Sequence, residues 1–115
     1  MNIEDFRDYC ISKPGVTEEF PFDETTLVFK VGGKMFALTD LEDEFSINLK
    51  CEPEKAIELR ELYPDSVFAG YHMSKKHWNK ILIDGRIPDK KLYEWTDLSY
   101  DLVFNKLPKA IRNKL

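Results

Sequence analysis

Both histidines of the chain lie in one eight-residue segment, residues 71–78, together with two adjacent lysines and two aromatic residues. Lysine side chains neutralise phosphate groups, and flat aromatic or imidazole rings stack on bases. Lys75 and Lys76 have little place in a packed core, because lysine is almost never fully buried unless it is paired. The segment therefore predicts contact with a phosphate-rich or base-bearing partner. The alternative is a solvated turn that leads into a strand beginning with a buried Trp78.

The same segment offers little for catalysis or metal binding. His72 and His77 are five residues apart, which places them on neither one helix face nor one strand face, and zinc needs more ligands than this pair. Ser74 precedes His77 by three residues, but no third group orients such a pair, and a turn hydroxyl is the simpler interpretation. Gly32 and Gly33 match neither phosphate-loop pattern. We predict a binding protein without catalytic residues, cofactor or metal ion.

Length and composition favour a single domain spanning residues 1–115, because 115 residues with 43% hydrophobic side chains can bury a sizeable core. No apolar run approaches the roughly 20 residues of a membrane span, and the first five residues carry acids where a secretory signal carries positive charge. Cys10 and Cys51 lack a paired spacing, so we expect two buried small side chains rather than a disulfide. These features predict a monomeric, cytoplasmic protein that does not interact with membranes.

The net charge of −4 argues against indiscriminate nucleic-acid binding, but the charge is unevenly distributed along the chain. Residues 1–65 carry 16 acids and 7 bases, whereas residues 66–115 carry 5 acids and 10 bases. If these halves correspond to different faces, an anionic partner is steered to the C-terminal half. The acidic segment 40–44 is expected to be a solvated loop, because it lacks the ligand spacing of a calcium site.

The first half of the sequence predicts a helix and three strands. Asn2 is a good N-cap for a short amphipathic helix that runs to about Ser12. Residues 16–24 are expected to be irregular. Residues 26–31 and 34–39 form a predicted hairpin around the glycine pair, and residues 45–50 alternate as a third, half-buried strand.

The second half predicts two further helices and at least one strand. Pro53 begins a helix that ends at Pro64, and residues 78–83 form a strand, while residues 66–69 are a strand or a packed connector. Asp89 is expected to cap a long final helix. Leu92, Trp95, Ser99, Leu102 and Val103 form its apolar stripe, and Pro108 separates it from a brief basic tail.

Several motifs, taken in order, resemble the MmcQ/YjbR family. They are the segments 14–19 and 21–22, 29–36, 49–51, 70–78 and 99–103, which together span nearly the whole chain. The resemblance implies an α+β fold of the frataxin-like (CyaY-like, double-wing) type, with helices packed on one face of an antiparallel sheet. Members of this family are commonly labelled DNA-binding, so the resemblance also implies a DNA-binding role.

The family motifs and the basic-aromatic segment together give a set of expected DNA-binding or anion-binding residues. In the leading hypothesis, lysines and an arginine hold phosphates while His77 or Tyr71 touches sugar or base. The predicted residues are Lys34, Lys50, Tyr71, His72, Lys75, Lys76, His77, Trp78, Lys80 and Arg86.

Two alternatives remain. The first is a protein-binding or small-anion-binding module with no nucleic-acid role, in which Arg86 or His72 is the charge partner. The second is weak metal binding by the acids of the first helix, Glu4, Asp5 and Asp8, although acids there usually serve the helix dipole. A recessed cluster around His72, His77 and Arg86 favours a small anion, and isolated lysines surrounded by acids favour neither partner. Nucleic acid is favoured by a continuous basic strip, formed by Lys34, Lys50, Lys75, Lys76, Lys80 and Arg86.

Overall fold

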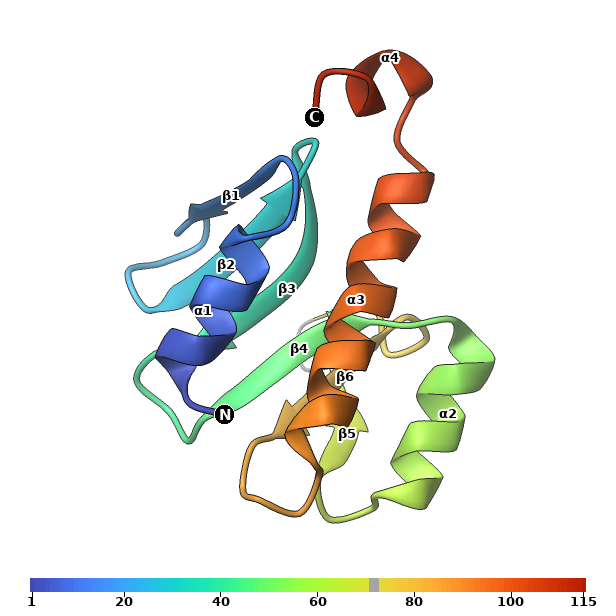
Figure 1. Ribbon diagram of the computed structural model, residues 1–115. Helices are drawn as coiled ribbons and strands as arrows, with labels where there is room; N and C mark the ends of the chain where they lie inside the picture. Colours follow the sequence, from blue (N-terminus) through green and yellow to red (C-terminus); the bar gives the residue numbers. More distant parts are fainter. Residues whose placement is uncertain (71–72) are drawn as a thin grey trace.

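The computed structural model describes residues 1–70 and 73–115 (Figure 1). Two of the predicted site residues, Tyr71 and His72, lie outside the described residues. The elements in chain order are α1 (Ile3–Ile11), β1 (Val16–Glu19), β2 (Thr26–Val31), β3 (Lys34–Asp40), β4 (Ser46–Lys50), α2 (Pro53–Leu62), β5 (Val67–Ala69), β6 (Trp78–Leu82), α3 (Asp89–Asn105) and α4 (Lys109–Arg112).

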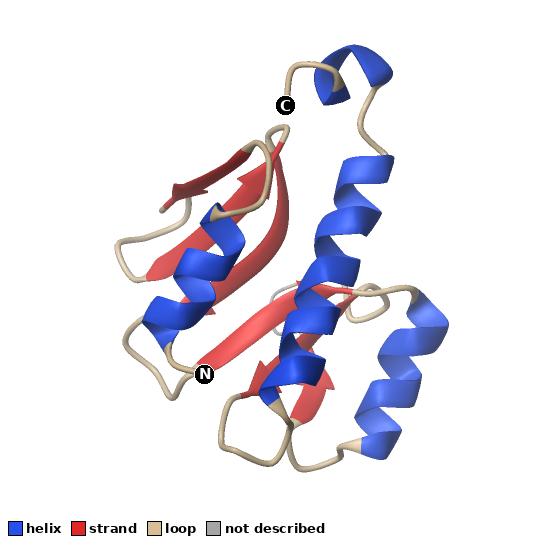
Figure 2. Ribbon diagram, viewed as in Figure 1, coloured by secondary structure: helices blue, strands red, loops and turns tan. Residues whose placement is uncertain are grey.

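The strands form one antiparallel sheet in the order β1-β2-β3-β4-β6-β5. Helices α1, α3 and α2 lie side by side on one face of this sheet (Figures 1 and 2). Helix α3 contacts the three strands β2, β3 and β4, whereas α2 contacts β5 and β6. The predicted α+β architecture, an antiparallel sheet with helices on one face, is therefore confirmed.

The hydrophobic core lies between the helices and the sheet. Alternate residues of each strand point toward the helices, as period-two side-chain alternation requires. The buried core includes Phe6 and Cys10 from α1, Leu27, Phe29 and Val31 from β2, Ile47 and Leu49 from β4, Ile81 from β6, and Leu92, Trp95 and Val103 from α3. We call the opposite surface of the sheet the open face.

Local sequence signals explain the elements that were predicted. The Asn2 side chain accepts a hydrogen bond from the Asp5 backbone N–H at 2.8 Å, and Asp5 reciprocates, which makes a capping box at the start of α1. Gly32 and Gly33 both have positive φ, 58° and 80°, as the tight β2–β3 turn requires. The predicted helix, hairpin and third strand are confirmed.

Two predictions were wrong. Residues 16–24 were expected to be irregular, yet Val16–Glu19 forms the edge strand β1, with Val16 opposite Val31. This strand pairs with β2 alone and contains a single apolar residue, Val16. The sequence of residues 16–19 therefore shows no alternation of apolar and polar side chains. Asp89 does not cap α3, because Pro88 occupies the N-cap position and the Asp89 carboxylate pairs with the N-terminal amino group at 2.9 Å.

The described helices were also compared with the requirements of a membrane span. In residues 1–70 and 73–115, no helix has both the length and the apolar character needed to cross a bilayer.

Candidate anion-binding hollow and adjoining groove

The candidate site begins where strands β3 and β4 separate. They pair directly at Ala37 with Leu49 and at Leu38 with Asn48. Farther along, the buried Ser99 hydroxyl of α3 donates a hydrogen bond to the Phe36 carbonyl and accepts one from the Lys50 backbone N–H at 2.8 Å. A helix side chain thus replaces the direct strand-to-strand hydrogen bonds, and the sheet opens at this point.

A hollow of about 430 Å³ lies at this opening. We call it the lysine hollow. Its lining residues are Lys34, Met35, Lys50, Trp78, Val103, Lys106, Leu107 and Pro108. Trp78 opens β6 directly opposite Lys50, is 7% exposed, and forms an aromatic wall outside the main core cluster.

The three lysines of the hollow make no ion pair with a described residue. Within residues 1–70 and 73–115, the ion pairs within 4.0 Å use the N-terminus, Arg7, Lys13, Lys30, Lys55, Arg86 and Lys91. Lys34, Lys50 and Lys106 are in none of them. Lysines that line one recess without such pairs make its electrostatic potential positive, which favours an anion.

The basic loop, residues 74–77, is fixed beside the lysine hollow. The His77 carbonyl accepts a hydrogen bond from the Cys51 N–H at 2.7 Å, one residue beyond Lys50. The Arg60 guanidinium of α2 donates to the Lys75 carbonyl and, at 2.7 Å, to Asn79 Oδ1. Lys75 and Lys76 are exposed and His77 is half-buried, so this loop extends the cationic surface outward from the hollow.

The structure brings only part of the predicted set together. Lys34, Lys50 and Trp78 line the hollow, and Lys75, Lys76 and His77 flank it. Arg86 lies on the β6–α3 connection, where its guanidinium pairs with Asp84 at 3.5 Å and Asp65 at 3.7 Å. Lys80 lies in a second, neighbouring depression.

Sequence reasoning missed Lys106. Its place follows from the turn after α3, where Leu107 packs so closely on the β2–β3 hairpin that a Cβ on Gly32 would lie 2.6 Å from it. Gly32 was recognised only as a turn former. Lys106 and Lys34 are far apart in the sequence, and no spacing pattern indicates that the turn after α3 meets the β2–β3 hairpin.

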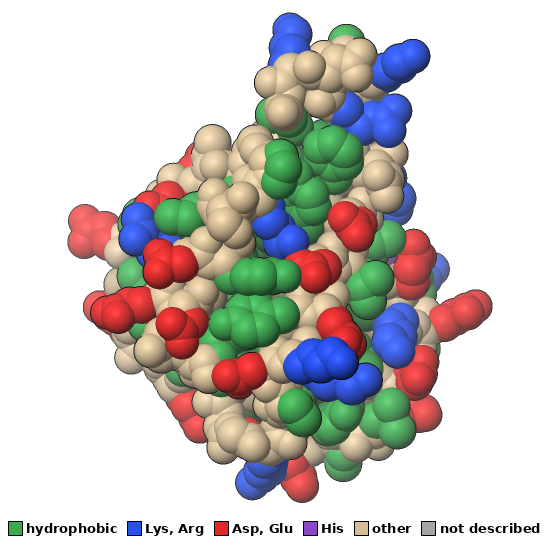
Figure 3. Space-filling model, viewed as in Figure 1, with side chains coloured by type: hydrophobic (Ala, Val, Ile, Leu, Met, Phe, Trp, Pro, Cys, Tyr) green, Lys and Arg blue, Asp and Glu red, His purple; other side chains and the backbone are tan. Residues whose placement is uncertain are grey.

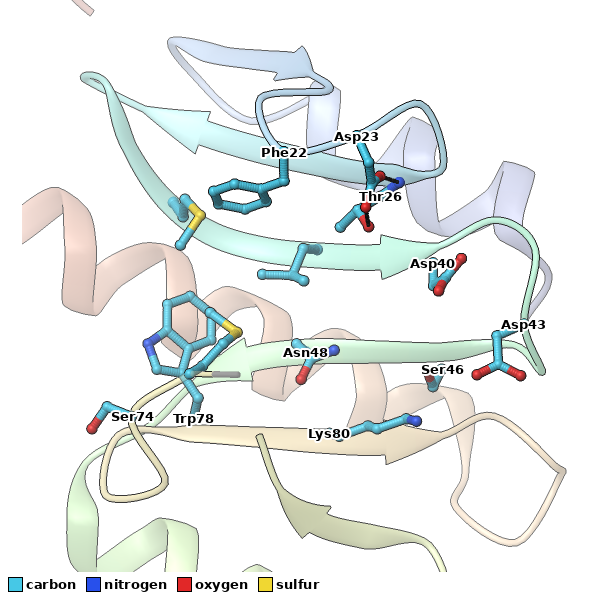
Figure 4. A pocket seen from close by; sticks show the side chains of 13 residues that line it. Phe22, Asp23, Thr26, Asp40, Asp43, Ser46, Asn48, Ser74, Trp78 and Lys80 are labelled. Carbon is cyan, nitrogen blue, oxygen red and sulfur yellow. Dashed lines mark hydrogen bonds between the residues drawn. The ribbon is translucent and has the colours of Figure 1, made fainter. Parts of the chain in front are cut away.

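The second depression, which we call the acidic groove, has a volume of about 680 Å³ and lies on the open face (Figure 4). It shares Met35 and Trp78 with the lysine hollow, so the two adjoin. Its apolar lining is Phe22, Met35, Leu38, Met73 and Trp78, and its polar lining is Asp23, Thr26, Asp40, Asp43, Ser46, Asn48, Ser74 and Lys80.

Two polar groups in the acidic groove have distinctive environments. The Asp23 carboxylate accepts hydrogen bonds from the backbone N–H groups of Thr25 and Thr26, which lowers its pKa and keeps it ionised at neutral pH. The Asn48 Oδ1 atom is buried and has no hydrogen-bond partner among the described residues. The groove therefore offers negative charge and an unused acceptor.

The helix-covered face is different in character. Acidic and basic side chains are interspersed over it, and the basic residues of α4 project at its upper end (Figure 3). This face presents no single-sign strip to a polyanion. The expected division of charge between two halves of the chain is not a division between faces, because Lys34 and Lys50 from the acidic half meet Lys106 from the basic half.

Metal and thiol chemistry find little support in the described residues. In residues 1–70 and 73–115, no group of three or more His, Cys, Asp and Glu side chains is placed to hold a metal ion. Both cysteines are free, and burial raises the pKa of each thiol. Protonated thiols are poor nucleophiles at neutral pH.

Comparison with known proteins places the chain in a family. The chain is 34% identical over 116 residues to the uncharacterized protein YjbR of Escherichia coli K12, covering all of this chain and 98% of the relative. It is 36% identical to the uncharacterized protein YbdF of E. coli O157:H7 over 107 residues, 92% of this chain and 87% of the relative.

Solved structures share the fold. The crystal structure of the Deinococcus radiodurans protein DR2400, described by the family domain DUF419, matches with a TM-score of 0.93 and 42% identity over 98% of this chain and 86% of that one. The crystal structure of the Pseudomonas syringae protein PsR293 matches with a TM-score of 0.76 and 25% identity, over 90% and 99%. Because the YjbR family model also matches residues 11–102, the chain belongs to the YjbR family.

Proposed function

We propose that this protein is a non-catalytic binding protein that holds an anionic group, a phosphate or a carboxylate, in the lysine hollow. The observation that carries the proposal is the convergence of Lys34, Lys50 and Lys106, none of them ion-paired to a described residue, on one recess beside Trp78. The recess differs from the cluster around His72, His77 and Arg86 that was expected of a small-anion site, because its cations are lysines and Arg86 pairs with Asp84 and Asp65. It explains the basic-aromatic motif without requiring a broad basic surface.

The physical argument is one of charge and shape. Three ammonium groups provide up to nine N–H donors, and the tryptophan wall lowers the local dielectric, which strengthens charge-assisted hydrogen bonds to an anion. Repulsion among the lysines is relieved when an anion enters. A volume of about 430 Å³ is within the range of small-molecule sites.

The test is calorimetric titration with phenyl phosphate at low and moderate salt. We expect salt-sensitive binding, because charged contacts to phosphate are screened. Lys50→Gln and Lys106→Gln should each weaken binding about tenfold, since one charged hydrogen bond contributes roughly 1.5 kcal/mol. Lys90→Gln is the matched control, because Lys90 is an exposed lysine at the other end of α3.

Equal affinity in the wild type and the two hollow variants would contradict the proposal. So would a loss of affinity in Lys90→Gln of the same size. Thermal unfolding of each variant shows whether it folds, and the removal of a surface charge from these lysines should change the melting temperature little.

Single-stranded DNA is a second candidate ligand, favoured by the basic loop beside the hollow. Exposed Lys75 and Lys76 give a second cationic contact next to the first, so consecutive phosphates of a flexible strand can reach both. Duplex DNA fits less well. A rigid, densely charged duplex laid over the hollow would bring phosphates close to the carboxylates of the acidic groove.

Fluorescence anisotropy separates the two ligands. Labelled single-stranded and duplex DNA are titrated at about 50 and 200 mM salt with the wild type and with Lys75→Ala/Lys76→Ala. Salt-sensitive binding of the single strand that the double variant loses supports a nucleic-acid role. If phenyl phosphate binds and neither DNA does at tens of micromolar protein, the function is restricted to small anions.

Three further expectations belong to this proposal. We propose that the arrangement of helices on one face of the antiparallel sheet belongs to the frataxin-like (CyaY-like, double-wing) fold, and superposition on members of that fold tests the relationship. The protein is proposed to be a monomer, which size-exclusion chromatography with light scattering tests. It is proposed to act in the cytoplasm, which cell fractionation tests.

A further inference from the structure

We infer that the ligand is bipolar: one molecule places its anionic group in the lysine hollow, its planar or apolar middle on Trp78 and Met35, and an ammonium or N–H donor group in the acidic groove. The anionic end of this inference rests on the proposed function. The donor end rests on separate observations in the groove.

The two charged ends lie a small molecule's length apart. Alternate residues of β4, namely Lys50, Asn48 and Ser46, face the open side of the sheet. Strand residues rise about 3.3 Å each, so Lys50 and Ser46 are roughly 13 Å apart. The Thr39 hydroxyl donates to the Ser46 carbonyl at 2.6 Å, which brings the adjacent Asp40 beside Ser46. Asn48 lies midway between the two ends.

Charge complementarity identifies what the acidic groove accepts. Asp23, Asp40 and Asp43 line it against one ammonium, that of Lys80. None of these four side chains makes an ion pair among the described residues, so the lining carries a net charge of −2 at neutral pH. The carboxylates are spread over the groove and are not grouped as metal ligands within the described residues. The complementary partner is an organic cation.

The Oδ1 acceptor of Asn48 also favours a ligand with a hydrogen-bond donor group. Its buried Oδ1 has no hydrogen-bond partner among the described residues, and a buried acceptor left unpaired costs about 1–3 kcal/mol. A carboxylate or a fully ionised phosphate cannot satisfy this atom, because it has no hydrogen to donate, whereas an ammonium or N–H group can once the Asn48 amide turns toward the groove.

The apolar walls favour a flat body between the charged ends. Trp78 and Met35 stand at the junction of the two depressions, and Leu38 and Met73 line the groove beyond them. The Phe22 ring, 63% exposed, adds an aromatic surface to the lining of the groove. Aromatic faces attract planar groups and organic cations.

A matched set of three probes tests the inference. O-Phosphotyramine carries a phosphate and an ammonium on one aromatic ring, phenyl phosphate carries only the anion, and tyramine carries only the cation. We expect O-phosphotyramine to bind at least tenfold more tightly than phenyl phosphate in calorimetric titrations. Asp40→Asn should remove most of that advantage while leaving the affinity for phenyl phosphate unchanged or slightly higher.

Asparagine is the right replacement because Asp40 Oδ1 accepts the Glu42 N–H at 2.9 Å, and an amide oxygen can keep that bond. Asp101→Asn is the control, because Asp101 is an exposed carboxylate on α3, on the helix-covered side. It should leave the advantage intact.

The outcomes separate the two proposals. If O-phosphotyramine and phenyl phosphate bind equally and both depend on Lys50, the bipolar ligand is wrong and the anion site stands. If neither phosphate binds, both proposals fail, even if tyramine binds. If the advantage of O-phosphotyramine survives in Asp40→Asn and in Asp43→Asn, the donor end does not lie in the acidic groove, and the inference is overturned.

Discussion

Ser99 joins the fold to the candidate site. Its side chain is fully buried, and its hydroxyl both donates to the Phe36 carbonyl and accepts from the Lys50 N–H. One side chain therefore satisfies a backbone group of β3 and one of β4 at the point where the strands separate. It also fixes the backbone of Lys50, which lines the lysine hollow.

Ser99→Ala should destabilise the protein by about 1–3 kcal/mol, because it leaves a backbone acceptor and donor without their partner. Urea unfolding measures this change. Thr96→Val is the control: Thr96 is equally buried on α3, but its hydroxyl bonds only to the Leu92 carbonyl of its own helix. A cost for Ser99→Ala no larger than that of Thr96→Val would show that the bridge is unimportant.

The two cysteines should differ in reactivity. Burial raises the pKa of both thiols, but Cys10 is completely buried in the core whereas Cys51 is partly accessible. A disulfide reagent at neutral pH should modify Cys51 first and Cys10 only as the protein unfolds. Mass spectrometry of the modified peptides checks the order, and early labelling of Cys10 would contradict the described core.

Helix α2 positions the basic loop. Arg60 donates to both the Asn79 side chain and the Lys75 carbonyl, and Asn79 Nδ2 donates to the Ala56 carbonyl at 3.2 Å. Hydrogen bonds of the Arg60 guanidinium and the Asn79 amide therefore link α2, strand β6 and the basic loop. A forked guanidinium suits this double role, and a lysine ammonium does not reproduce it.

Arg60→Lys should therefore loosen the loop without removing its charge. The amides of His77 and Trp78, which donate to the Ser74 carbonyl, should exchange roughly fivefold faster, corresponding to about 1 kcal/mol of lost local stability. Hydrogen exchange by NMR measures this directly. Unchanged exchange at both amides would mean that α2 does not hold the loop.

The edge strand β1 depends on an ion pair with α1. The Arg7 guanidinium donates to both carboxylate oxygens of Glu18, at 2.7 and 2.5 Å, and this lowers the pKa of Glu18. A lowered carboxyl pKa adds stability that is fully present above the ordinary value of 4.5 and is lost as the pH falls through the lowered value.

Wild type should accordingly be more stable than Glu18→Gln at pH 7, and the difference should disappear on acidification below the lowered pKa of Glu18. Urea midpoints of both proteins at several pH values between 7 and 3 test this. A difference that grows as the pH falls would contradict the assigned ion pair.

At the scale of the whole molecule, the acidic groove of the open face adjoins the lysine hollow, whose charge is opposite. The net charge of −4 conceals this arrangement, because averages along the sequence do not correspond to faces. The lysine hollow draws one lysine from β3, one from β4 and one from the end of α3. On the helix-covered face, acidic and basic side chains are interspersed (Figure 3).

The sequence predicts the fold better than it predicts the site. The Asn2 N-cap, the glycine turn and the alternation in β4 are local signals, and each is found in the structure. The site depends on contacts between distant segments: Leu107 against Gly32 brings Lys106 to the hollow, and Phe22 reaches the groove from the β1–β2 connection. Such contacts leave no periodic trace in the sequence.

Trp78 is a position at which the sequence alone does not distinguish a packed side chain from a binding surface. The sequence left open whether this residue is packed or serves as a binding surface. The structure shows a side chain that is only 7% exposed, yet it faces the open side and lines both depressions. The two interpretations are compatible, because a buried ring can form the wall of a recess.

The most direct test of the anion site uses the two tryptophan indole N–H signals in an NMR titration with phenyl phosphate. Trp78 lines the lysine hollow, whereas Trp95, a residue of α3, is equally buried in the core. We predict a saturable shift of the Trp78 signal, with shifts at the Lys34, Lys50 and Lys106 amides and little change at Trp95. Shifts confined to other surfaces, or none at millimolar phenyl phosphate, would contradict the account.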